Sequence, residues 1–227
     1  MDTRIDQLSF EEWILYVFDH SVTEPAWYWD NYDFWDPMAQ PRVTVSYLTN
    51  LFENLVNTLS AYSDAQINQG LRYLVSNSLS DHMFPLKDKQ VPLTERLNGL
   101  QSMYKLFETL FLPRCSANLC YLDEKENGTP NPLDSVCYMW WDTLPIHGST
   151  AGPDTPVTAD TILSVITRTL TLNSDACRES ALHGLGHWHY YDPKRIEHIV
   201  DDFLAANPHT RPELLTYARN ARNGGVQ

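Results

Sequence analysis

The segment from Ser174 to Pro208 constrains the fold more than any other part of the chain, because it carries the signals of a complete helix–turn–helix unit. Ser174 or Asp175 can cap the first helix, since a short oxygen-bearing side chain accepts a hydrogen bond from a free backbone N–H. Pro193 suits the first position of the second helix, where its missing N–H costs no hydrogen bond. Both helices carry apolar residues at the spacing of a core-facing stripe. The expected core positions are Cys177, Ala181, Gly184, Leu185 and Trp188, followed by Ile196, Ile199, Val200, Phe203 and Leu204.

This unit, residues 174–208, resembles a HEAT repeat of armadillo-like α-solenoids and of phycobilin lyase-type proteins. The matching residues are Asp175, Arg178, Ala181, Leu182, Leu185, Gly186, Asp192, Pro193, Ile196, Ile199 and Leu204. The resemblance implies an all-α chain, a HEAT-like α–α superhelix of antiparallel helix pairs without a significant sheet. It implies more about the fold than about activity, because one fold serves many functions.

The remainder of the chain shows helical periodicity between loops rich in turn residues, with no strand-like alternation. Ser9 with Glu12 and Ser63 with Gln66 match capping boxes and predict two helix starts. We expect a single helical domain over residues 1–227. Its expected parts are an N-terminal helix with an aromatic capping loop (1–42), helical pairs (43–112), an exposed loop (113–132) and C-terminal helical repeats (133–222).

Composition limits the partners of the chain. The net charge of −13 opposes binding to nucleic acid, because phosphates repel an acidic surface. No apolar run reaches the roughly 20 residues that a membrane span needs, and the N-terminal residues lack the pattern of a secretory signal. We therefore expect a cytoplasmic protein that binds neither nucleic acid nor membrane and keeps its 4 cysteines reduced.

Histidines gather in the first helix of the unit. Histidines four residues apart project from one helix face and can chelate a divalent metal ion. Glu179, His183 and His187 form such a row on the face opposite Trp188, whereas His189 points elsewhere. The favoured interpretation is a polar helix face that contacts a partner. A metal site at His183 and His187 is the alternative, and its third ligand would have to come from a neighbouring helix.

The segment between the first two predicted helices is rich in aromatic and acidic residues, with Trp27, Trp29 and Trp35 among several aspartates. Tryptophan is a common anchor of protein interfaces, and aromatic rings beside carboxylates attract cations. The favoured interpretation is a cap that packs its rings on the end of the solenoid. A binding surface for a protein or for a small cationic ligand is the alternative.

The sequence contains no pattern for an activated nucleophile, a phosphate-binding loop or a dinucleotide-binding turn. We therefore expect no catalytic residue and no cofactor, and favour a non-catalytic α-solenoid that binds a protein or peptide, a basic one in view of the net charge. The expected partner-binding residues are Glu179, His183, His187, Trp27, Trp29 and Trp35. Two alternatives stay open: a metal-dependent hydrolase that uses His183 and His187, and a module that binds a small cationic ligand at the aromatic loop.

Overall fold

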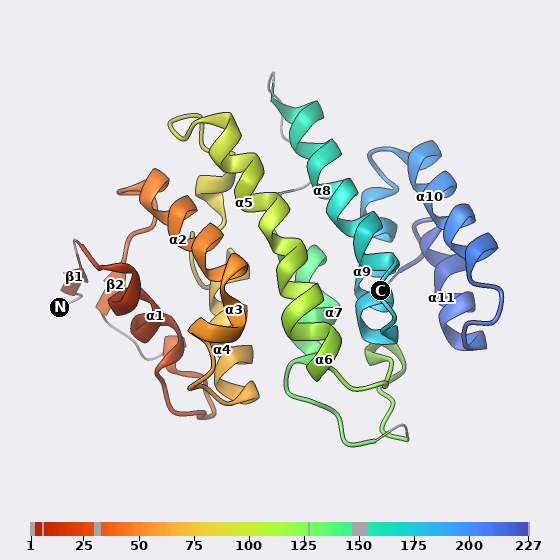
Figure 1. Ribbon diagram of the computed structural model, residues 1–227, viewed down its shortest axis with the longest axis horizontal. Helices are drawn as coiled ribbons and strands as arrows, with labels where there is room; N and C mark the ends of the chain where they lie inside the picture. The colour runs from red at the N-terminus through yellow and green to blue at the C-terminus, as the bar shows by residue number, and fades with distance from the viewer. Residues whose placement is uncertain (1–2, 6, 30–32, 127, 147–153, 227) are drawn as a thin grey trace. The chain divides into compact units, whose positions relative to one another are not determined.

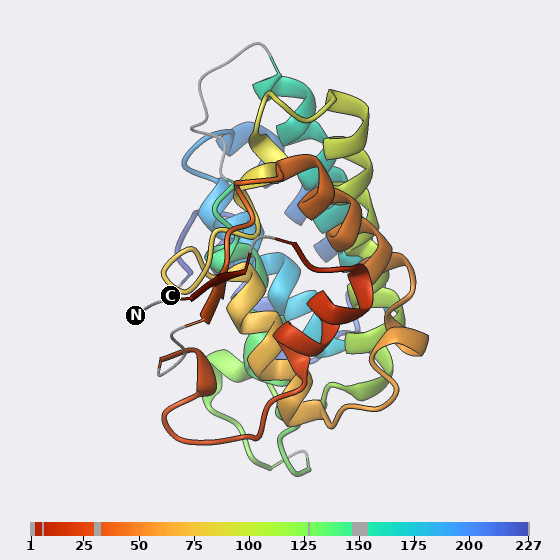
Figure 2. The ribbon, with the colours of Figure 1, turned by 90° about the vertical axis from the view of Figure 1, so that its left-hand side faces the viewer.

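The computed structural model describes residues 3–5, 7–29, 33–126, 128–146 and 154–226. Within these residues the predicted all-α character is confirmed, because helices form nearly all of the regular structure. The one described sheet is a parallel pair of three-residue strands, β1 (Thr3–Ile5) and β2 (Asp33–Trp35), which lie side by side near the N-terminus (Figure 2). None of the described helices has the length and apolar character that a membrane span requires.

The chain divides into two compact units, Met1–Met103 with Thr143–Ile146 and Tyr104–Asp142 with His147–Gln227. The first unit contains α1 (Phe10–Phe18), η1 (Trp27–Trp29), α2 (Pro41–Glu53), α3 (Leu55–Thr58), α4 (Asp64–Val75), η2 (Phe84–Lys87) and most of α5 (Leu93–Lys105). Both predicted capping boxes are confirmed, since Ser9 with Glu12 begins α1 and Ser63 with Gln66 begins α4. These two helices pack against each other.

The second unit begins in the last turn of α5 and continues without a break into the π-helical segment η3 (Leu106–Phe111). Its other elements are α6 (Leu112–Arg114), η4 (Cys120–Leu122), most of α7 (Asp134–Thr143), α8 (Thr155–Leu170), α9 (Asp175–Trp188), α10 (Pro193–Ala206) and α11 (Pro212–Ala221). The predicted helix–turn–helix unit is α9 with α10. Ser174 caps α9 by accepting from the N–H of Cys177, and Pro193 begins α10.

Helix α9 is the centre of the second unit. It packs against α8, α10 and α11 (Figure 1), and 11 of its 14 residues are buried. Gly184 makes a close approach to α7 possible, because a Cβ at this position would lie 2.6 Å from the Cβ of Trp141. The contact between Gly184 and Trp141 therefore fixes how near α7 lies to α9.

The segment 113–132 is largely irregular, as expected, but it is not exposed throughout. Asn118 and Leu119 are 2% and 0% exposed. The N–H of Leu119 donates to Glu124, and the Asn118 side chain donates to Ser116 and to the carbonyl of Gly128. The middle of this segment is thus a packed part of the second unit.

Candidate metal centre

The face of α9 that carries Glu179 and His183 is buried, whereas the polar residues on it predict an exposed face. Both residues are 1% exposed. The 115–124 segment and α11 supply their hydrogen-bond partners. The prediction that these two side chains contact a partner is therefore wrong. Of the predicted row, His187 alone reaches solvent, with 37% of its side chain exposed.

Asp142 on α7 joins the two histidines. His187 Nε2 lies 3.2 Å from His183 Nε2 and 3.2 Å from Asp142 Oδ1, and the three atoms lie within 4.8 Å of one another. Metal–ligand bonds of roughly 2.1 Å at tetrahedral or octahedral angles place neighbouring ligand atoms about 3.0–3.4 Å apart. Two of the three spacings in the cluster therefore match those around a bound metal ion.

The helix packing explains why Asp142 reaches the cluster. The preceding residue, Trp141, packs its Cβ against Gly184 and stacks its ring on Phe107, with ring centroids 5.4 Å apart. Gly184 lies on α9 between the two histidines in sequence, so the Trp141 contact brings the end of α7 to them. Asp142 lies on a different helix from the histidines, so no helical spacing in the sequence connects it to them. Its position directly after Trp140 and Trp141 is a weak indication that it lies near the core.

The surroundings of His183 favour the neutral imidazole that a metal ion requires. Burial, and then the proximity of His187, lower the pKa of His183 to about 4, although Asp142 acts in the opposite direction. The Nδ1 atom of His183 lies 2.7 Å from Tyr217 Oη, which lies 3.0 Å from Tyr138 Oη. The Nε2 atom is the one that faces the cluster.

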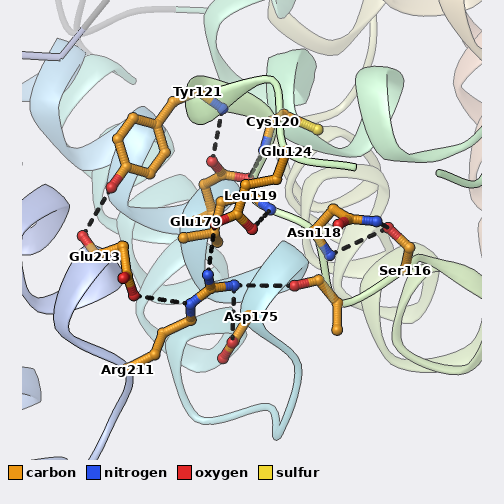
Figure 3. A network of polar contacts seen from close by, with 11 residues as sticks. Ser116, Asn118, Leu119, Cys120, Tyr121, Glu124, Asp175, Glu179, Arg211 and Glu213 are labelled. Carbon is orange, nitrogen blue, oxygen red and sulfur yellow. Dashed lines mark hydrogen bonds and ion pairs between the residues drawn. The ribbon is translucent and has the colours of Figure 1, made fainter. Parts of the chain in front are cut away.

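The Glu179 side chain makes hydrogen bonds within the protein. Its two carboxylate oxygens accept hydrogen bonds from the backbone N–H groups of Cys120 and Tyr121, each at 2.9 Å (Figure 3). Burial raises its pKa to about 7, even though both N–H groups favour the ionised form. Because both oxygens are engaged, Glu179 holds the 115–124 segment on α9 and is not free to act as a base.

Arg211, at the start of α11, contacts the same segment. Its guanidinium donates to Glu124 at 2.6 Å, to the carbonyl of Ala117 at 3.1 Å and to Glu213 at 3.2 Å (Figure 3). This side chain is 21% exposed, so solvent screens its ion pairs only in part. The segment is therefore attached to both α9 and α11.

The remaining predicted site residues do not join the cluster. His189 lies 3.8 Å from Glu197 on α10, which agrees with the prediction that it points away from the row. Trp35 is 4% exposed, with its ring 5.4 Å from that of His82, so the prediction that it contacts a partner is wrong. Trp27 is half-buried and stacks on His20, with ring centroids 3.8 Å apart, whereas Trp29 is 64% exposed.

No protein-family model, no curated protein and no solved structure matches this chain. The functional assignment therefore rests on the geometry of the cluster and on the chemistry of its side chains.

Proposed function

We propose that this protein is a metal-dependent hydrolase that binds one divalent ion through Asp142, His183 and His187. The observation that carries the proposal is the pair of 3.2 Å spacings between ligand atoms from two separate helices. From the sequence alone this function is an alternative, because the two histidines have no third ligand at a recognisable spacing. The position of Asp142 favours it over the scaffold.

The donor set supports a catalytic role for the ion. Two imidazoles and a carboxylate bind zinc in catalytic sites and iron(II) in non-haem sites, whereas structural zinc sites usually have four protein ligands. Three protein ligands leave a position for water, and the side chains of His187 and Asp142, 37% and 35% exposed, let solvent reach it. A zinc ion held by these residues would supply hydrolytic chemistry at neutral pH, because zinc lowers the pKa of bound water to about 7.

Zinc titration of chelator-treated protein tests the site. We expect the wild type to bind one ion, and His187→Ala and Asp142→Asn to lose more than the roughly 10–100-fold in affinity that follows loss of an outer-shell partner. His198→Ala is the matched control, because His198 is a 78% exposed histidine that lies 3.5 Å from an aspartate, Asp202, on the surface of α10. Equal affinity of wild type and His187→Ala would overturn the assignment.

The hydrolytic part of the proposal has its own test. Zinc-loaded wild type should hydrolyse an activated ester faster than the metal-free protein, and His187→Ala should not respond to zinc. A wild type that binds zinc but hydrolyses activated carboxylate and phosphate esters no faster than the metal-free protein would leave a metal site without the proposed activity.

A second candidate function is the binding of a basic protein or peptide by a HEAT-like helical array. The consecutive packing of α8, α9, α10 and α11 and the exposure of Trp29 in a chain of net charge −13 support it. An oligo-arginine peptide should then quench tryptophan fluorescence in the wild type and not in Trp29→Ala. Leu15→Ala, at a 51% exposed position, is the control. Quenching by tetramethylammonium instead would favour the small-cation module, and an unchanged response in Trp29→Ala would contradict both.

A further inference from the structure

We infer that Tyr217 is a positioning residue of the metal centre, whose hydroxyl selects the tautomer of His183 that leaves Nε2 free for the ion. The inference rests on the proposed metal site. To the three proposed ligands it adds the hydrogen bonds that orient one of them, His183.

The tautomer decides whether His183 can act as a ligand. A neutral imidazole carries one proton, on either Nδ1 or Nε2, and a ring nitrogen that binds metal cannot carry it. The Nε2 atom of His183 faces His187 and Asp142. The proton must therefore lie on Nδ1, where Tyr217 Oη, 2.7 Å away, accepts the hydrogen bond.

Tyr217 can accept from His183 because its own proton has another acceptor. Tyr138 Oη lies 3.0 Å from Tyr217 Oη. A phenol keeps its proton at neutral pH, so each hydroxyl has one hydrogen to donate. In the orientation that metal binding requires, His183 Nδ1–H donates to Tyr217 and the Tyr217 hydroxyl donates to Tyr138. Loss of the second acceptor would turn the Tyr217 proton toward His183 and favour the wrong tautomer.

The 115–124 segment holds Tyr217 in place. Tyr217 is 3% exposed, and the ring of Tyr121 stacks on it with centroids 4.3 Å apart and planes 23° apart. The backbone N–H of Tyr121 donates to Glu179, and this bond supports the position of the ring without the Tyr121 hydroxyl (Figure 3). The bond between Tyr121 and Glu179 therefore supports the ring that packs on Tyr217, and Tyr217 in turn contacts His183.

The test compares zinc affinity and the state of His183 in three variants. Tyr217→Phe removes the hydroxyl and keeps the ring, and should weaken zinc binding about 10–100-fold, the range typical of outer-shell partners. In the metal-free variant, 15N NMR should show His183 shifting toward the Nε2–H tautomer. Tyr121→Phe is the matched control, because its hydroxyl lies in the same stack but bonds Glu213, and its zinc affinity should be unchanged. If Tyr217→Phe does not fold, Tyr138→Phe replaces it and should also weaken zinc binding.

The outcomes separate this inference from the proposed function. Wild-type zinc affinity in Tyr217→Phe, or an unaltered His183 tautomer, would overturn the role of Tyr217 and leave the metal site standing. Equal losses in Tyr217→Phe and Tyr121→Phe would show that loss of either hydroxyl of the stack weakens zinc binding, and that the hydrogen bond between Tyr217 and His183 has no special role, which also overturns the inference. A wild type that binds no zinc would overturn the proposed function and this inference together.

Discussion

His183 and Glu179 lie one helical turn apart on α9, and burial shifts the pKa of each in the direction that favours its uncharged form. The pKa of His183 falls to about 4, whereas that of Glu179 rises to about 7. Both directions follow from the loss of water around a charge. His183 is therefore neutral at physiological pH, and Glu179 is the buried carboxyl of this helix that titrates near neutrality.

Glu179→Gln should change how protein stability depends on pH. The folded-state pKa of about 7 lies above the ordinary value of 4.5, so between these pH values the folded state binds more protons than the unfolded chain. Stability contributed by this carboxyl is thus present below pH 4.5 and falls by roughly 3 kcal/mol as pH rises through 7. Urea unfolding across this range should show a flatter pH profile for the variant.

For Glu179→Gln, the quantity to compare is the slope of the unfolding free energy against pH. The absolute stability does not isolate the titration, because glutamine replaces one acceptor oxygen by an amide group at every pH. Glu213→Gln is the control, since Glu213 belongs to the same network but is 46% exposed. Its profile should run parallel to that of the wild type. Parallel profiles for wild type and Glu179→Gln would show that Glu179 does not titrate in this window.

Among the elements, α7 and α9 build the candidate site together, and Gly184 determines their distance. Cys177, Ala181, Leu185 and Trp188 are buried as the apolar stripe predicts, but the opposite face of α9 is buried as well. That face tolerates burial because its polar groups have partners in the 115–124 segment, in α7 and in α11.

Gly184→Ala should destabilise the protein and weaken zinc binding. Alanine gains about 1 kcal/mol in helix propensity over glycine, but overpacking costs about 1–3 kcal/mol. Here the new Cβ would lie 2.6 Å from Trp141 Cβ, an atom that cannot move without its backbone, so α7 and Asp142 must shift. Thermal unfolding and zinc titration measure the two effects. Gly225→Ala, whose new Cβ would lie 3.5 Å from the carbonyl oxygen of Asn220, should change neither. Wild-type stability and affinity in Gly184→Ala would contradict the role of Gly184 in setting the distance between α7 and α9.

The helix starts were predictable from the sequence because their signals are local. Ser9 with Glu12, Ser63 with Gln66, and Pro193 each act on backbone groups within a few residues. The place of Asp142 in the cluster was not predictable, because Asp142 reaches the histidines only through the packing of Trp141 on Gly184. The burial of Glu179 was missed for the same reason, since the segment that covers it is distant in sequence and reads as an exposed loop.

At the scale of the whole molecule, the proposed chemistry lies within one compact unit. Asp142, His183, His187, Tyr217 and the 115–124 segment all belong to the second unit. The all-α character follows from periodicity along the chain. The HEAT-like superhelix and the basic partner stay proposals, and the net charge of −13 supports the partner through the steering of opposite charge.

The measurement that tests the central claim most directly is elemental analysis by mass spectrometry of the purified, tag-free protein, beside His187→Ala prepared in the same way. The account predicts close to one zinc, iron or manganese ion per wild-type chain and a marked loss in the variant. A wild type without metal that stays empty after incubation with these ions, or equal metal content in the two proteins, would contradict the assignment of Asp142, His183 and His187 as a metal centre.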